Sequence, residues 1–235
     1  IDYLGEAGVW PAHANESGLL DLAGFRKNQF YFRKALWTDA PMVYLSTSGI
    51  PIRRQPATMP AFPAIHCYTN CDSVELFHDG QSLGSKSHAD GEIIVWPTEF
   101  TSGVMKAVGK KGDATTTFEL KHAGPPAKIE LLPDISSLQA NGRAVAQIEV
   151  QITDADGTLV PDAENLLTCA LSGPAQIIGI ENGNIYGTES NKGPSHSVHQ
   201  GKMLIYLQSL KTAGELKLTI SSPNLEDSSI TLPVH

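Results

Sequence analysis

Apolar and polar residues alternate with a period of two over much of the chain after about residue 64. Between Ala146 and Ile152 every second residue is aliphatic, and the residues between them are Gln or Glu. Leu216–Ile220 repeats the pattern. Because side chains of a strand point alternately to its two faces, these segments predict strands with one buried face and one solvated face.

A second set of apolar runs predicts a smaller sandwich. Val74–His78 leads into Asp79-Gly80, a dipeptide that favours a two-residue hairpin turn, and Gln81–Gly84 then runs back. Further strands are predicted over residues 93–96, 104–108 and 115–120. Gly124-Pro125-Pro126 marks a boundary, after which strands recur about every ten residues, as in immunoglobulin-like sandwiches.

One segment near the start has helical spacing. Phe25, Phe32 and Leu36 fall on one face of a helix predicted over residues 25–37, which ends before Pro41. Trp37, at its end, is expected to pack where the helix meets the sandwich. A strand, a loop and a helix cannot bury themselves alone, so Ile1–Leu22 is expected to be mobile or to pack in a non-native or intermolecular way.

The predicted fold is therefore mainly β: two tandem immunoglobulin-like sandwiches preceded by a strand, a loop and a helix. It divides into an N-terminal segment at residues 1–45, a proline-rich linker at 46–63, a first sandwich at 64–124 and a second sandwich at 125–235.

Composition narrows the classes of function. The 235 residues carry a net charge of −8, which disfavours nucleic acid and anionic membranes as partners. No apolar run approaches the roughly 20 residues of a membrane helix. The three cysteines fit neither a disulfide framework nor a zinc site. Cys67 and Cys71 could form a disulfide only across a turn; otherwise all three are interpreted as buried apolar residues.

No metal or cofactor is predicted. The histidines show no metal-binding spacing. Asp154-Ala155-Asp156-Gly157 begins like a calcium loop, but Thr158 and Asn165 stand at its fifth and twelfth positions, so a turn is the better interpretation. Glu16 and Asp21 are interpreted as a loop acid and as a turn or cap residue.

Three stretches together resemble family 2 glycoside hydrolases of the β-galactosidase-like branch. Asp2–Glu6, Trp10-Pro11 and Ser17–Lys27 resemble the last strand, loop and helix of that family's catalytic barrel. Tyr68–Gly84 is similar to the sandwich that follows the barrel, and residues 154–165 with 179–184 are similar to a further C-terminal sandwich. The resemblance covers nearly the whole chain in the family's domain order, and it makes residues 1–45 a remnant of the barrel.

The resemblance implies a retaining mechanism with two glutamates, an acid/base and a nucleophile. It places both upstream of Ile1, so no catalytic residue is predicted here and the chain itself is expected to hydrolyse nothing. Asp2, Glu6 and Trp10 flank the end of the barrel strand where active sites of this architecture lie, so they are predicted to be near the substrate of the parent enzyme. Alternatively, Asp2 anchors the barrel rim and Glu6 is a solvated loop residue.

The resulting hypothesis is a C-terminal, non-catalytic part of a bacterial, periplasmic or extracellular family 2 glycosidase that acts on β-galactosides. The expected partners are the missing barrel and a β-linked glycan, and residues 1–45 could also mediate self-association. One alternative is a carbohydrate-binding module that uses Trp96 as a glycan contact, although core packing is the favoured interpretation of this residue. Another is a generic immunoglobulin-like surface or interaction module.

Overall fold

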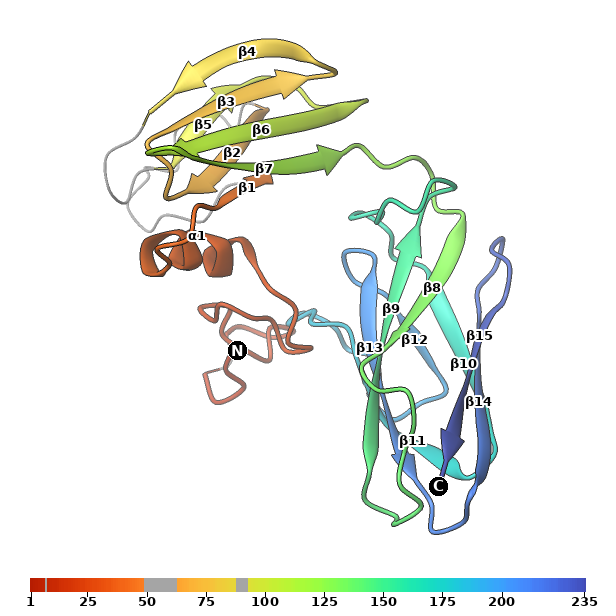
Figure 1. Cartoon of the computed structure of the whole chain (residues 1–235). Coiled ribbons are helices and arrows are strands. Elements are labelled where there is room, and N and C mark those ends of the chain that lie inside the picture. The colour runs from red at the N-terminus through yellow and green to blue at the C-terminus, as the bar shows by residue number, and fades with distance from the viewer. Residues whose placement is uncertain (7, 49–62, 88–92) are drawn as a thin grey trace. The chain divides into compact units, whose positions relative to one another are not determined.

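A computed structural model of the chain describes residues 1–6, 8–48, 63–87 and 93–235. In the part that it describes, the backbone is mainly β with one helix, which confirms the predicted fold class (Figure 1). The chain forms two compact units, one made of Ile1–Phe25 with Ala123–His235 and the other of Arg26–His122. Most of the predicted linker lies outside the described residues.

The Arg26–His122 unit contains two antiparallel sheets. The three-stranded sheet has the order β1-β2-β5, with β1 at Val43–Ser46, β2 at Ala64–Thr69 and β5 at Ile94–Pro97. The four-stranded sheet has the order β4-β3-β6-β7, with β4 at Gln81–Lys86, β3 at Ser73–His78, β6 at Val104–Lys111 and β7 at Ala114–Lys121. Buried aliphatic residues from both sheets share one core, so this is the smaller sandwich that the sequence predicted.

The predicted hairpin is confirmed. Asp79 and Gly80 have φ values of +46° and +83°, the left-handed pair that a two-residue turn of this type requires. The Asp79 carboxylate also accepts a hydrogen bond of 2.8 Å from the backbone N–H of Val104 on β6. The turn is therefore tied to the next strand of its sheet as well as closing β3 onto β4.

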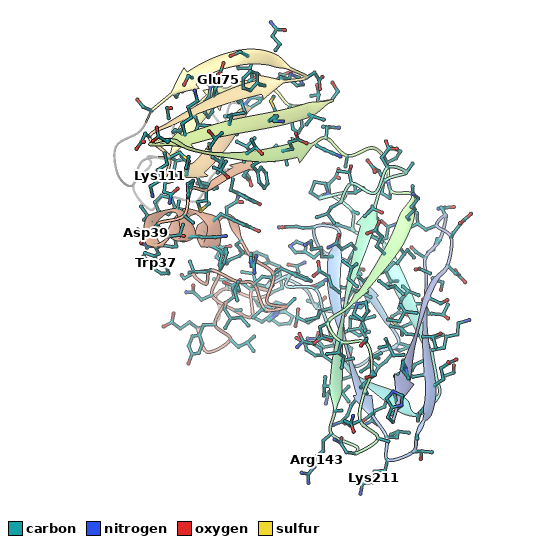
Figure 2. The ribbon with its side chains drawn as sticks, viewed as in Figure 1. Trp37, Asp39, Glu75, Lys111, Arg143 and Lys211 are labelled. Carbon is teal, nitrogen blue, oxygen red and sulfur yellow. The ribbon has the colours of Figure 1, made fainter. Side chains whose placement is uncertain are left out.

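The helix differs from its prediction. α1 spans Asn28–Trp37, so Phe25 precedes it, and Ala35 is its one buried residue. Trp37 is 73% exposed, so its predicted packing is wrong (Figure 2). The predicted apolar face is right in part: Leu36 is 44% exposed, but the Phe32 ring lies 6.3 Å from that of Tyr68 on β2. Tyr31 also contacts the sheet, with its ring stacked on that of Tyr44 of β1 at 3.6 Å between ring centres.

Strand β1 was not predicted. Val43–Ser46 pairs antiparallel with β2, in register from Val43 opposite Thr69 to Ser46 opposite His66. Four residues are too few to show alternation in the sequence, and the prediction placed them where residues 1–45 meet the linker. The structure therefore divides residues 1–45 between two units, because α1 and β1 pack with the smaller sandwich.

The Ala123–His235 segment forms the larger sandwich, with two four-stranded antiparallel sheets. The first has the order β11-β13-β9-β8, with β11 at Ala175–Glu181, β13 at Lys202–Ser209, β9 at Val145–Thr153 and β8 at Lys128–Pro133. The second has the order β12-β10-β14-β15, with β12 at Ser195–Ser197, β10 at Leu166–Ser172, β14 at Gly214–Ser221 and β15 at Ser228–Val234.

The core of the larger sandwich follows the predicted alternation. Every second residue from Ala146 to Ile152 is fully buried, and so are Leu216, Leu218 and Ile220 of the facing sheet. The cysteines are buried with free thiols, as the apolar interpretation predicted, and burial raises the pKa of the Cys67 thiol to about 12. A thiol that stays protonated at neutral pH packs as a small apolar group.

The Asp154 loop is a hydrogen-bonded turn. The buried Asp154 carboxylate accepts hydrogen bonds from the backbone N–H groups of Gly124 at 2.8 Å, Thr158 at 2.8 Å and Asp156 at 2.9 Å. These donors, Gly124 first and Thr158 next, lower the pKa of Asp154 because they favour its charged form. The turn therefore ties the end of β9 to the segment that enters β8.

Asp154→Asn is expected to destabilise the larger sandwich at neutral pH, because an amide NH₂ cannot accept from a second backbone N–H. Because the pKa of Asp154 is lowered in the folded state, its carboxylate stabilises the fold above the unfolded pKa of about 4. This stabilisation is lost as pH falls through the pKa of the folded state. Urea unfolding at pH 7 and pH 3 measures the change, with Asp156→Asn as a matched surface control. A deficit that is equal at both pH values would contradict the prediction.

Candidate functional site

The first 25 residues fold back on themselves. Tyr3 and Asn15 exchange two backbone hydrogen bonds, of 3.1 and 2.9 Å, and the N–H of Asp2 donates to Leu20 at 2.8 Å. Residues 1–6 form this isolated bridge but no strand, because a strand needs a neighbouring strand for its hydrogen bonds.

The three residues predicted to lie near a substrate have different environments. Asp2 is 5% exposed, and its carboxylate accepts a hydrogen bond of 2.9 Å from the Gly18 N–H. Glu6 is exposed and lies 3.4 Å from the Asn15 amide nitrogen. Trp10 is 76% exposed. Asp2 therefore organises the segment internally, whereas Trp10 offers a free aromatic face.

Trp96 packs in the core, which confirms the favoured interpretation and contradicts the alternative role as a glycan contact. It is 3% exposed and belongs to the core of the smaller sandwich. The Lys86 ammonium lies 5.4 Å from the centre of its ring. A side chain that seals the core in this way has no face to present to a sugar.

The N-terminal segment packs on the larger sandwich of its own chain, whereas the sequence predicted that it is mobile or packs in a non-native or intermolecular way. The His13 N–H donates to the Ile185 carbonyl at 2.9 Å. The Asp21 carboxylate lies so close to Gly183 that an added Cβ there would overlap it. The Lys202 ammonium lies 5.1 Å from the centre of the Phe25 ring. These contacts place the segment against the loop that follows β11 and against the start of β13.

Burial changes the acidity of Asp21. Desolvation raises its pKa to about 6, although the Phe25 N–H donates to the carboxylate at 2.8 Å and favours the charged form. The sequence interpretation of Asp21 as a turn residue is consistent with that bond. The sequence did not show that this turn contacts Gly183, in the loop that follows β11.

The free energy of unfolding of Asp21→Asn, relative to that of the wild type, is expected to be higher at pH 7 than at pH 4. A raised carboxyl pKa means that the native state holds the proton more tightly, so wild-type stability falls as pH rises from about 4 to 6. The variant removes this loss and keeps an oxygen for the Phe25 N–H. Urea midpoints of both proteins are measured at pH 4 and pH 7. The effects of all other titrating groups cancel in the difference between variant and wild type at each pH. A difference that does not change with pH would count against the prediction.

A hollow of about 290 Å³ opens between this segment and the larger sandwich. Its lining comes from the N-terminal segment, from the end of β11, from the loop between β11 and β12, and from β12. The residues are Trp10, His13, Glu181, Asn182, Asn184, Gly187, Thr188, Glu189, Asn191 and His196. All of them belong to one compact unit.

Side chains of the loop fix its shape. The Asn182 amide donates to the Ser197 carbonyl at 3.0 Å, and its oxygen accepts from the Asn184 N–H at 2.9 Å. The Asn184 oxygen in turn accepts from the Tyr186 N–H at 2.9 Å. Short polar side chains that bond their own backbone two residues on are typical of tight turns. The loop is therefore preformed without any ligand.

The two carboxylates of the hollow are engaged. Glu181 accepts hydrogen bonds from the N–H groups of Asn182 and Gly183 at 3.0 and 2.9 Å, and from the Asn191 amide at 2.8 Å. Glu189 accepts from the Ser197 hydroxyl at 3.0 Å and from its N–H at 3.2 Å. They hold the loop in place, and their remaining lone pairs leave the hollow rich in acceptors.

His196 is buried beside Glu189. It is 3% exposed, and its Nδ1 lies 2.9 Å from the Ser197 carbonyl and 3.5 Å from a Glu189 oxygen. A carbonyl only accepts, so Nδ1 carries the proton in the neutral ring and Nε2 is left as an acceptor. Among the described residues Nε2 has no hydrogen-bond partner.

The comparisons with known proteins agree with the fold. A family model described as glycoside hydrolase family 2 C-terminal domain 5 matches residues 129–231, and a domain of unknown function matches residues 64–116. A β-galactosidase of Bacteroides ovatus is 34% identical over 230 residues, which cover 96% of this chain and 26% of that protein. The chain belongs to glycoside hydrolase family 2 and matches the C-terminal region of its members.

Other relatives extend this result. A β-glucuronidase of Formosa agariphila is 26% identical over 92% of this chain and 22% of its own length. The crystal structure of a β-glycosidase from Bacteroides vulgatus matches with a TM-score of 0.87 and 33% identity, covering 99% of this chain and 30% of that one. This family 2 region thus spans about a quarter of the length of the curated relatives it matches.

The described residues show neither a metal cluster nor a membrane span. No three His, Cys, Asp or Glu side chains among them gather closely enough to hold a metal ion. The helix found there is too short to cross a bilayer.

Sequence reasoning found Trp10 but missed the other wall of the hollow. The sequence connected residues 179–184 only to a resemblance with a family sandwich, and His196 and Glu189 carried no recognisable spacing. The available signal was the density of Asn, Gly and Ser between Asn182 and Ser197, which indicates an elaborate loop and not its neighbours in space.

Proposed function

We propose that this chain is a non-catalytic C-terminal part of a retaining family 2 β-glycosidase that acts on β-galactosides. The observation that carries the proposal is the match over 96% of the chain to a quarter of a β-galactosidase. A relative named as a β-glucuronidase shares the same region, so this region by itself is compatible with more than one glycoside in the family.

The state of the carboxylates supports a non-catalytic role. A retaining glycosidase needs an acid and a nucleophile, both free to reach the anomeric centre. Asp2 is buried and accepts from Gly18, and Glu181 and Glu189 accept from their own loop. Carboxylates that hold backbone N–H groups serve structure, and a nucleophile would have to break those bonds.

The exposed apolar residues support the catalytic barrel as the partner. Ile1, Tyr3, Leu4 and Val9 are between 62% and 91% exposed within one short segment. Apolar groups crowded in this way are normally covered by protein. We therefore propose that the barrel packs on this segment and that the sandwiches support it and shape the approach to its site.

An activity assay tests this proposal. The purified chain is expected to hydrolyse neither nitrophenyl β-galactoside nor nitrophenyl β-glucuronide, whereas the full-length enzyme cleaves the galactoside. Glu181→Gln and Glu189→Gln variants of the chain serve as controls for any residual signal. Turnover by the chain that these substitutions abolish would overturn the non-catalytic role, and a full-length enzyme inactive on β-galactosides would overturn the proposed substrate.

A further inference from the structure

We propose that the hollow between Trp10 and the β11–β12 loop is a binding subsite for one neutral pyranose unit. The inference rests on the proposed glycosidase function, which makes a sugar the expected ligand. The geometry of the hollow indicates which kind of sugar fits. It assigns to the last sandwich a direct part in sugar recognition, in addition to support of the barrel.

The aromatic wall is the first argument. Trp10 is 76% exposed although it is one of the largest apolar side chains, and it stands at the rim of the hollow. The face of an indole ring carries negative charge density, which attracts the C–H groups on the apolar side of a pyranose. Trp37 is equally exposed at 73% but stands at the end of α1, in the other unit.

Unused polar groups are the second argument. His196 lines the hollow, and its Nε2 has no hydrogen-bond partner among the described residues. A sugar hydroxyl can donate a hydrogen bond to Nε2. The Asn184 amide nitrogen and the Asn191 amide oxygen also have no hydrogen-bond partner among the described residues, which adds a donor and an acceptor.

Charge and size are the third argument, and they define the ligand. The lining contains two glutamates and neither Lys nor Arg, so an anionic sugar would meet like charge. At about 290 Å³ the hollow is at the lower end of the range for ligand sites, which is suited to a single ring. A neutral hexose such as galactose therefore fits better than a uronic acid.

The loop is also rigid enough to bind. Asn182, Asn184 and Glu181 already hold its backbone through the bonds described above. His13 joins the N-terminal wall to it through the bond to Ile185. A preformed site loses less conformational entropy on binding than one that must order itself.

Ligand-observed NMR with the 235-residue chain tests the proposal. The probes are methyl β-galactopyranoside and methyl β-glucuronide, each titrated to 100 mM. Saturable binding of the galactoside in the millimolar range is expected, with the glucuronide at least tenfold weaker. Trp10→Ala is expected to weaken galactoside binding at least tenfold, and Trp37→Ala is the matched control that leaves it unchanged. Because Trp10 is exposed, its truncation spares the fold, which circular dichroism verifies.

Each other outcome overturns the inference. No galactoside binding, equal binding by Trp10→Ala, or an equal loss with Trp37→Ala would show that the hollow is not the subsite. Tighter binding of the glucuronide would overturn the neutral-sugar assignment. None of these results depends on hydrolysis, so failure of the subsite is distinguishable from failure of the proposed function, which the activity assay decides.

Discussion

Replacing Gly173 with alanine is expected to lower the free energy of unfolding of the larger sandwich by about 3 kcal/mol or more. Gly173 has a φ of +90° where the chain leaves β10 in one sheet for β11 in the other. A Cβ there would overlap the Glu215 carbonyl oxygen and lie 2.7 Å from the Leu216 Cα, both on β14. A paired strand cannot shift without losing hydrogen bonds, so this overlap adds to the backbone strain.

Gly24→Ala separates the two contributions. Gly24 has a φ of +91° in the same unit, and a Cβ there meets no atom within 4 Å. The control is therefore expected to lose only the left-handed strain of about 1–2 kcal/mol. Urea unfolding followed by far-ultraviolet circular dichroism measures both variants. Equal losses would show that the overlap with β14 contributes nothing.

Truncating Ile205 to alanine is expected to cost about 2–5 kcal/mol of unfolding free energy. Ile205 is fully buried in β13, the strand that pairs with both β9 and β11 in the middle of its sheet. It lies opposite Ile148 on one side and Ile180 on the other. Removing three carbons there loses apolar burial and leaves a cavity that two paired neighbours prevent from closing.

Ile178→Ala is the control for that substitution. Ile178 lies on β11 of the same sheet but is 41% exposed, so the same change of side chain is expected to cost less than about 1 kcal/mol. The midpoint of urea unfolding gives the comparison. If both variants lost similar stability, burial in this core would not be what makes Ile205 important.

Strand positions were predictable where the alternation was long. From Ala146 to Ile152 seven residues carry the pattern, and a shift by one residue would expose every aliphatic side chain. The Asp79-Gly80 turn was predictable for a different reason, because few other residues tolerate φ > 0. In both cases the information lies within a few consecutive residues.

Short or aromatic elements were not predictable in this way. Val43–Ser46 becomes a strand because β2 supplies the hydrogen-bond partners. The helix begins at Asn28 and leaves out Phe25, whose backbone N–H donates to the Asp21 carboxylate in a turn. Its packing uses Tyr31 on Tyr44, a contact with a strand that the sequence did not reveal. Partners distant in the sequence decide such elements.

The sequence by itself determined the sandwich strands, the tight hairpin and the resemblance to family 2 glycosidases, since each depends on residues adjacent in the chain. Only the tertiary structure decided that Trp10, near the start, stands over the same hollow as His196. It also decided between the two interpretations of Trp96 in favour of the core, and it brought the Asp21 carboxylate into contact with Gly183. The surroundings of a side chain set its burial, the pKa of Asp21 and the hydrogen bonds of His196. No local pattern in the sequence encodes those surroundings.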